Sequence, residues 1–284
     1  VDSEIYGCLI YNIGGQRKGR GQGNGHNIYT QNRVGTKQIR DNLVFNGYRN
    51  GIDIYTQQGA IDGFDIIGNT IFGASACANE GGKKMDIVIG GMKPASRIRV
   101  EENLGWANGL GRHCEFGYMS DPHRDIRLVN NTFAGRVTFR TWEKLEMTGN
   151  TFWGGISGPV DPKQYPDNRY GKPPRESVVF VRPNRYEPGR GHITVFNWAE
   201  ADTVPVDLAA VVPAGAAYEL RNAQNWQAGP VRRGVYNGKP VELPMTGQEP
   251  PQPIGAPGYL TPEEMTGKAF NVFVVESWTP GRRP

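Results

Sequence analysis

Three acidic side chains recur at one position of a repeated strand-like pattern, an arrangement that can cleave glycosidic bonds. Asp53 lies in GIDIYTQ, Asp86 in KMDIVIG and Glu115 in HCEFGYM. Alignment on the middle residue of each pattern adds Asn27 and Thr138 to the same row. Glycosidases use paired carboxyl groups about 5–5.5 Å apart for retention and about 6.5–9.5 Å apart for inversion. The spacing therefore makes Asp53, Asp86 and Glu115 the candidate catalytic residues.

The expected separations of these acids follow from strand geometry. Neighbouring strands lie about 4.8 Å apart, so unshifted stacking puts Asp53 roughly 5 Å from Asp86 and roughly 9.6 Å from Glu115. These values match both glycosidase geometries and do not choose between them. Adjacent carboxylates also repel, which favours a general acid or recruits a cation such as Ca²⁺. An ordinary acidic face exposed to water is the alternative.

Polar and aromatic side chains flank the predicted acidic row. We expect substrate contacts from Tyr29, Tyr55, Asn27, Arg140, Lys84 and His113. A lyase would need a basic residue to remove a proton, and none of the nearby Lys and Arg residues has a diagnostic context, so hydrolysis is favoured over elimination. His26 aligns with the inward Ile52 and is expected to be a buried histidine.

The acids need strands with one buried face, and the residues beside them supply it. Side chains alternate along a strand, so outward acids direct their neighbours inward. The predicted inward residues are Ile28, Ile54, Ile87, Phe116 and Phe139.

A second pattern accompanies the first, in which a strand ends at an Asn and restarts with apolar residues. The two patterns stay in step at offsets of about 12 to 17 residues. A buried amide needs partners, and a stack of amides supplies them. We expect a ladder of Asn42, Asn69, Asn103, Asn131 and Asn150, with Cys8 in the first place. Aromatic residues three places later, Phe45, Phe72, Trp106 and Trp153, are interpreted as a stack filling the interior.

The strand patterns repeat at intervals of about 23 to 33 residues, which is typical of a solenoid. The xIxxNxIFxG coil with its Asn ladder resembles the right-handed parallel β-helix of the pectate-lyase-like superfamily, over roughly residues 4 to 155. That superfamily includes polysaccharide lyases, glycoside hydrolases, epimerases, phage tailspikes and non-catalytic surface proteins. The resemblance implies the architecture and an extracellular or secreted protein, with the periplasm or cell surface as other locations.

The chain is expected to be all-β, in two parts. We predict a right-handed parallel β-helix over residues 1–156, lacking upstream coils because the chain opens directly on a strand-like run. Residues 157–177 are Pro-rich and predict a linker or loop. Residues 178–284 hold short alternating strands between turns and predict a β-sandwich.

Composition excludes several classes of partner. The formal net charge of +4 is scattered, with no basic stripe, so no nucleic-acid partner is predicted. No apolar run approaches the roughly 18 residues of a membrane span. Three cysteines give no disulfide framework or metal spacing.

The leading functional hypothesis is an extracellular protein that acts on a polysaccharide or other glycan through the acidic row. One alternative is a non-catalytic surface, adhesion or structural protein. Another is a fragment of a larger β-helix protein, whose partner would be an upstream β-helix segment or a second chain.

Overall fold

The computed structural model describes residues 2–16, 23–74, 76–77, 85–107, 112–252 and 266–279. The described chain divides into two compact units, with the boundary between Pro173 and Pro174. Within these ranges, every regular element apart from short 3₁₀ turns is a β-strand.

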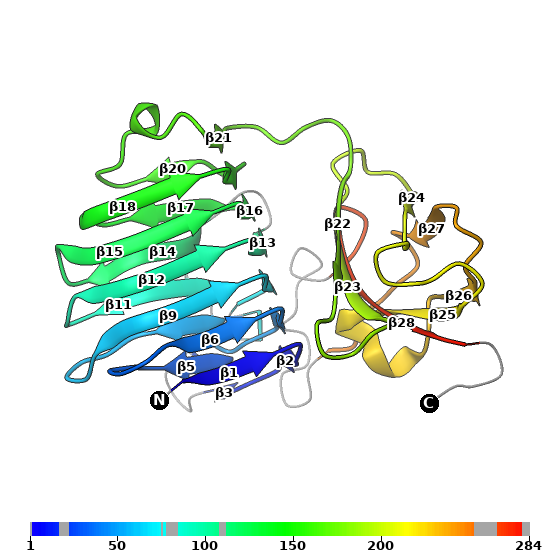
Figure 1. Ribbon diagram of the computed structural model, residues 1–284, viewed down its shortest axis with the longest axis horizontal. Coiled ribbons are helices and arrows are strands. Elements are labelled where there is room, and N and C mark those ends of the chain that lie inside the picture. Colours follow the sequence, from blue (N-terminus) through cyan, green and yellow to red (C-terminus); the bar gives the residue numbers. More distant parts are fainter. Residues whose placement is uncertain are drawn as a thin grey trace. The chain divides into compact units, whose positions relative to one another are not determined.

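The first unit is a parallel β-helix of three sheets, which confirms the predicted architecture (Figure 1). The first sheet contains β1 (Ser3–Tyr6), β6 (Lys37–Arg40), β9 (Ile61–Ile67), β12 (Ala95–Glu101), β15 (His123–Val129) and β18 (Trp142–Thr148). The second contains β2 (Leu9–Tyr11), β7 (Leu43–Phe45), β10 (Thr70–Phe72), β13 (Leu104–Trp106), β16 (Thr132–Ala134), β19 (Thr151–Phe152) and β21 (Arg169–Tyr170). The third contains β5 (Ile28–Thr30), β8 (Ile52–Ile54), β11 (Ile87–Gly91), β14 (Arg112–Met119), β17 (Arg136–Phe139) and β20 (Ile156–Ser157). A short ribbon of β3 (Gly15–Gln16) and β4 (Gly23–Asn24) leads into β5.

The interior of the β-helix is filled by apolar residues from all three sheets. The five residues that the alternation predicted to point inward are all buried in one hydrophobic cluster, namely Ile28, Ile54, Ile87, Phe116 and Phe139. Burying such side chains contributes roughly 1.5–3 kcal/mol each, which is the main free energy that holds the coils together.

The predicted Asn ladder is present and continuous. The Nδ2 of Asn69 donates to Oδ1 of Asn103 at 2.9 Å, and the Nδ2 of Asn103 donates to Oδ1 of Asn131 at 3.0 Å. Each Oδ1 also accepts the backbone N–H of the preceding ladder residue, as Asn42 does from Cys8 at 3.0 Å. The remaining Nδ2 hydrogen binds a carbonyl of the coil before, which for Asn103 is that of Ile66 at 2.7 Å. Every polar atom of the ladder amides is therefore used.

The ladder extends beyond the predicted end of the β-helix. The Nδ2 of Asn150 donates to Oδ1 of Asn168 at 2.7 Å, and β21 pairs in parallel with β19. Tyr170 stacks on Phe152 with ring centroids 5.6 Å apart. The Pro-rich segment, expected to be a linker or loop, thus supplies one more coil through Tyr170, because its prolines lie outside the two residues that pair.

The aromatic stack three places after the ladder lies on the outer side of the second sheet. Phe45 stacks between Tyr11 and Phe72, with centroid distances of 5.0 and 5.1 Å. Val44 and Ile71 belong to the interior cluster, and side chains alternate along a strand, so Phe45 and Phe72 point away from it. The interpretation of these rings as interior filling was therefore wrong, although both are buried.

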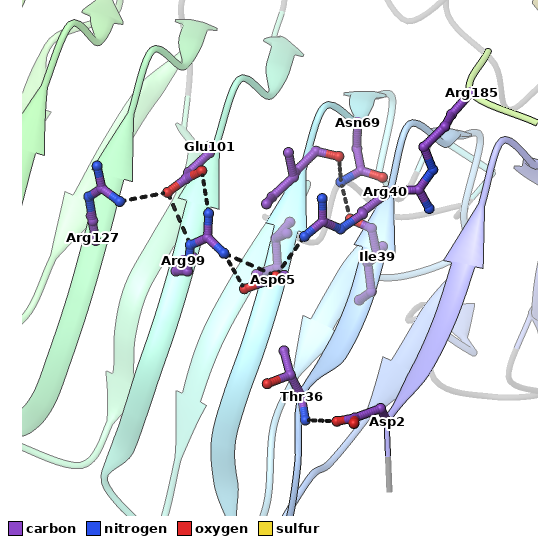
Figure 2. A network of polar contacts seen from close by, with 12 residues as sticks. Asp2, Thr36, Ile39, Arg40, Asp65, Asn69, Arg99, Glu101, Arg127 and Arg185 are labelled. Carbon is purple, nitrogen blue, oxygen red and sulfur yellow. Dashed lines mark hydrogen bonds and ion pairs between the residues drawn. The ribbon is translucent and has the colours of Figure 1, made fainter.

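The outer face of the first sheet carries a network of ion pairs (Figure 2). Asp65, Arg99, Arg127 and Glu146 occupy one position on four successive strands. Asp65 contacts Arg40 at 2.7 Å and Arg99 at 3.2 Å. Arg99 and Arg127 in turn contact Glu101 at 2.9 and 3.3 Å. The pairs made by the exposed Arg99 and Arg127 are worth only about 0–1 kcal/mol each, so they support strand register more than total stability.

The second unit has two β layers, as the predicted sandwich requires. A five-stranded antiparallel sheet runs in the order β22 (Val178–Pro183), β23 (Arg190–Phe196), β28 (Phe270–Trp278), β25 (Ala217–Asn222), β26 (Arg232–Val235). A two-stranded ribbon contains β24 (Thr203–Val206) and β27 (Val241–Pro244). Val204 and Leu243 of the ribbon share one hydrophobic cluster with Phe273 of the sheet.

Replacing one ladder residue should weaken the whole first unit. In Asn103→Ala, the N–H groups of Asn69 lose their acceptor and the Ile66 carbonyl loses its donor, all in fully buried positions. Each buried unsatisfied group costs about 1–3 kcal/mol, so we expect a loss of about 3 kcal/mol or more in urea unfolding. Met92→Ala, at a position 57% exposed, is the control and should change stability by less than about 0.5 kcal/mol. Equal effects of the two changes would contradict the ladder's role.

The ion pair of Arg97 with Asp62 predicts a pH-dependent contribution. The Arg97 hydrogen bond holds the pKa of Asp62 below its ordinary value of 3.8, while burial acts in the opposite direction. A lowered carboxyl pKa stabilises the fold above the unfolded-state pKa, and this contribution is lost as the pH falls through the folded-state pKa. We expect Arg97→Gln to cost about 0.2–1 kcal/mol at pH 7 and progressively less below about pH 3.8.

Urea titrations across that pH range measure the effect. Lys93→Gln, which removes an exposed cation without an ion pair in the described part of the chain, is the control. A cost of Arg97→Gln that stays constant down to about pH 2 would show that the pair does not act through the Asp62 charge.

Candidate functional site

A cavity of about 490 Å³ opens on the outer face of the third sheet. Its floor is formed by Asp53, Val88 and Glu115, which occupy one position on β8, β11 and β14. The neighbouring strand β5 adds Tyr29 beside Asp53, and β14 adds Tyr118. The remaining lining comes from residues before or after the strands, namely His26, Arg49, Asn50, Tyr55, Gln57 and Met85. The cavity thus brings together two of the three predicted acids and both predicted tyrosines.

The register of the third sheet differs from the predicted row. Tyr29 pairs with Asp53, Asp53 with Val88, and Val88 with Glu115. Asp86 lies two residues before Val88, so it does not share a row with Asp53. Asn27 likewise lies two residues before Tyr29. A slip of two residues keeps every side chain on its face, which is why the inward residues were predicted correctly while the row was not.

The two acids on the floor each have a basic neighbour. Oδ2 of Asp53 lies 3.0 Å from Nδ1 of His26, a close approach without in-line hydrogen-bond geometry. Oε1 of Glu115 lies 3.6 Å from Nε of Arg140, whose side chain is 53% exposed. Asp53 and Glu115 are only 5% and 3% exposed, so they lie in a recess and not on the open face that was expected.

Asp86 forms a separate buried contact with His113. Its Oδ2 lies 2.5 Å from Nδ1 of His113, and its Oδ1 accepts the backbone N–H of Ala74 at 2.8 Å. His113 is fully buried, and its ring packs 5.5 Å from that of Phe133. Asp86 and His113 therefore hold the chain at Ala74 against the interior of the coil. Neither residue lines the cavity.

Gly105 makes room for the buried imidazole. It pairs with the inward Phe133, at a position where a side chain would point into the interior. A Cβ built on Gly105 would lie 1.8 Å from Nε2 of His113. A glycine is required here because the histidine occupies the space of a core side chain.

Only some of the other predicted substrate contacts lie at the cavity. Tyr29 and Tyr55 line the cavity, and Arg140 reaches it through Glu115. Asn27 donates from Nδ2 to the carbonyls of Ile10 and Phe45, both at 3.0 Å, so it joins neighbouring strands of the coil. Lys84 lies outside the described residues.

The alignment missed several residues of the lining, and His26 was expected to be a core residue. Arg49 and Asn50 precede the repeated pattern, so no pattern marks them. Met85 lies within KMDIVIG, at a position that the alignment with Ile52 predicts to point inward. Strict alternation from the outward Glu115 would point Tyr118 inward. It faces outward because β14 is irregular at Gly117, which has φ +108°. A glycine in a strand is a signal of such a bulge.

The charges of this cavity distinguish it from a larger one. A cavity of about 600 Å³ lies over the first sheet, but it is lined by the side chains of the ion-pair network, which already contact one another. In the third-sheet cavity, carboxylates lie beside exposed rings and an arginine, Arg49, that forms no ion pair within the described chain. This is the arrangement that can exchange protons with a bound molecule.

The described residues contain neither a metal-binding cluster nor a helix that could cross a membrane. Within the residues that the structure describes, no group of three or more His, Cys, Asp or Glu side chains could hold a metal ion such as Ca²⁺. No helix in the same ranges is long and apolar enough to cross a membrane.

Comparisons of the chain with protein-family models, with curated proteins and with solved structures give no match.

The packing of Gly105 against His113 can be tested by a double-mutant cycle. Gly105→Ala should overfill the interior and cost about 1–3 kcal/mol in urea unfolding. Gly15→Ala, where an added Cβ meets nothing within 4 Å, should cost less than about 0.5 kcal/mol. Because His113→Ser removes the obstructing ring, Gly105→Ala should cost clearly less in that background. Strict additivity of the two changes would contradict the assignment.

Proposed function

We propose that this chain is an extracellular or secreted protein that hydrolyses a polysaccharide, as glycoside hydrolases among the pectate-lyase-like β-helix proteins do. The observation that carries the proposal is the floor of the third-sheet cavity, where Asp53 and Glu115 flank the apolar Val88. Two strand spacings separate their backbones by about 9.6 Å. A backbone separation of that size suits inversion better than retention, since inverting enzymes hold their carboxyl groups about 6.5–9.5 Å apart and retaining enzymes only about 5–5.5 Å apart.

The chemistry needs one carboxylic acid and one carboxylate. The acid protonates the leaving oxygen of the glycosidic bond, and the carboxylate removes a proton from the attacking water. His26 and Arg140 each lie beside one of these groups, so both acids have a neighbour that holds them in place. The buried floor favours this role, because charges interact more strongly where water is scarce.

Substitution of the two acids tests this proposal. Asp53→Asn and Glu115→Gln should each lower the release of reducing ends from a panel of soluble polysaccharides by on the order of 10²–10⁴-fold. Glu143→Gln, an exposed acid on β18 of the first sheet, is the control and should keep full activity. Thermal unfolding of all variants checks that the fold survives.

Three outcomes would contradict hydrolysis by these residues. The first is undiminished activity of both variants. The second is an unsaturated product, which would show elimination. The third is glycan binding by the intact protein without cleavage of any member of the panel, which would favour a non-catalytic surface protein. Proton NMR of the first product reports whether the anomeric configuration is inverted.

A further inference from the structure

Three tyrosines from three coils form a continuous strip beside the acidic floor. The ring centroids of Tyr29 and Tyr55 are 6.5 Å apart, and those of Tyr55 and Tyr118 are 6.1 Å apart. Tyr29 is 50% exposed and Tyr118 is 39% exposed, and none of the three belongs to the interior cluster. All three line the same cavity as Asp53 and Glu115.

The contact between Tyr55 and Tyr118 depends on a glycine. Gly90 pairs with Tyr118 on β14, and its neighbour Ile89 pairs with Ile54, the residue before Tyr55. Tyr55 and Tyr118 are therefore two strand spacings apart, about 9.6 Å, yet their rings meet at 6.1 Å. The strand between them carries Gly90 at that position. A Cβ on Gly90 would lie 2.4 Å from the Tyr118 nitrogen, so a glycine is required for β11 and β14 to pair in this way.

Packing in a hydrophobic core explains buried rings but does not explain a row of exposed ones. Tyrosine presents a flat apolar face and a polar hydroxyl, and it is favoured where one side of a contact is apolar and the other is wet. Here the rings line a cavity whose other walls offer hydrogen-bonding groups, among them Asn50, Gln57 and His26. Flat apolar faces alternating with polar edges are the complement of a pyranose ring whose hydroxyls are equatorial.

The charges of the lining argue against a polyanion. Asp53 and Glu115 lie on the floor, and among the residues that the structure describes the charged groups and the histidine beside them are Arg49, Arg140 and His26. Opposite charges are therefore close to balance, in contrast to the cationic surface that a polyanionic ligand needs. Stacking is the recognition that this wall offers.

The tilt between the rings further restricts the class of glycan that can bind. Tyr29 and Tyr55 are inclined by 47°, and Tyr55 and Tyr118 by 53°. A rigid flat array of chains would touch one ring at a time, whereas a single flexible chain can turn from one sugar to the next and meet each ring.

From these contacts we propose that the tyrosine strip is the binding platform for a soluble, neutral, β-linked glycan with mainly equatorial hydroxyls, lying across successive coils. This inference rests on the proposed function, since it names the substrate class of the same site. Tyr29, Tyr55 and Tyr118 are substrate-contacting residues that determine specificity, and Gly90 permits their arrangement.

Binding is measured by calorimetry in an Asp53→Asn, Glu115→Gln background, so that no ligand is consumed. The probes are xylohexaose and cellohexaose, with maltohexaose and a hexamer of galacturonate as comparison ligands. We expect a β-linked neutral hexamer to bind most tightly. Tyr55→Ala and Tyr118→Ala should each raise its Kd by about three- to tenfold, because the ring contact is lost.

Two control variants separate ring stacking from other effects. Tyr55→Phe and Tyr118→Phe keep the rings and should weaken binding less than the corresponding alanine variants. Tyr186→Ala removes a tyrosine that is 60% exposed in the second unit and should leave Kd unchanged. Gly90→Ala should weaken binding as the tyrosine variants do, and thermal unfolding checks its fold.

The platform assignment is overturned if the alanine variants bind as tightly as the parent, or if maltohexaose or the galacturonate hexamer binds more tightly than both β-linked neutral probes. If that occurs while Asp53→Asn still abolishes hydrolysis, the proposed function stands and the substrate class fails. If binding depends on the tyrosines but the intact protein cleaves none of the probes, the platform stands and hydrolysis fails.

Discussion

The hydrogen-bonded stack of asparagine amides is the constraint on which the rest of the β-helix depends. An amide offers one acceptor with two lone pairs and two donor hydrogens, and each ladder residue uses all of them. One donor bonds to the amide of the next coil, and the other bonds to a carbonyl of the coil before. Because every one of these atoms is buried, an error in stacking would leave several polar groups unsatisfied, at about 1–3 kcal/mol each. The ladder therefore fixes how each coil lies on its neighbours.

The ladder also explains which parts of the fold could be predicted from the sequence. An Asn followed by apolar residues recurs in each coil, so the second sheet and its stacking were predicted correctly from residue types alone. The row of the third sheet that contains Asp53 follows the ladder residue of the same coil by about 7 to about 19 positions. No local pattern reports how much of the intervening segment is loop, and a slip of two residues leaves the alternation of apolar and polar side chains intact. The faces of the strands were therefore predictable, and the row that contains Asp53 was not.

Asp86 illustrates how this slip altered the candidate site. Its residue type and local pattern match those of Asp53, yet its carboxylate contacts His113 in the interior, where Gly105 of the second sheet leaves space for the imidazole. Asp86 immediately precedes β11, His113 lies on β14 and Gly105 lies on β13, so only the folded coil brings them together. The bulge at Gly117, which turns Tyr118 outward, has a local signal in the glycine itself, but its effect on the next side chain requires the paired strand.

The observed positions of Asp86 and Tyr118 determine which side chains line the cavity. With Asp86 withdrawn, the position between the two remaining acids is occupied by Val88, so the carboxyl groups are separated by an apolar side chain and not by a third charge. Three carboxylates in one row would repel one another and attract cations, whereas two that each lie beside a basic group can remain in a recess only 3% to 5% exposed. With Tyr118 turned outward, the wall of that recess becomes aromatic over three coils. Under the proposed function, the two separated acids would transfer protons while the tyrosine rings beside them stack on the same glycan chain.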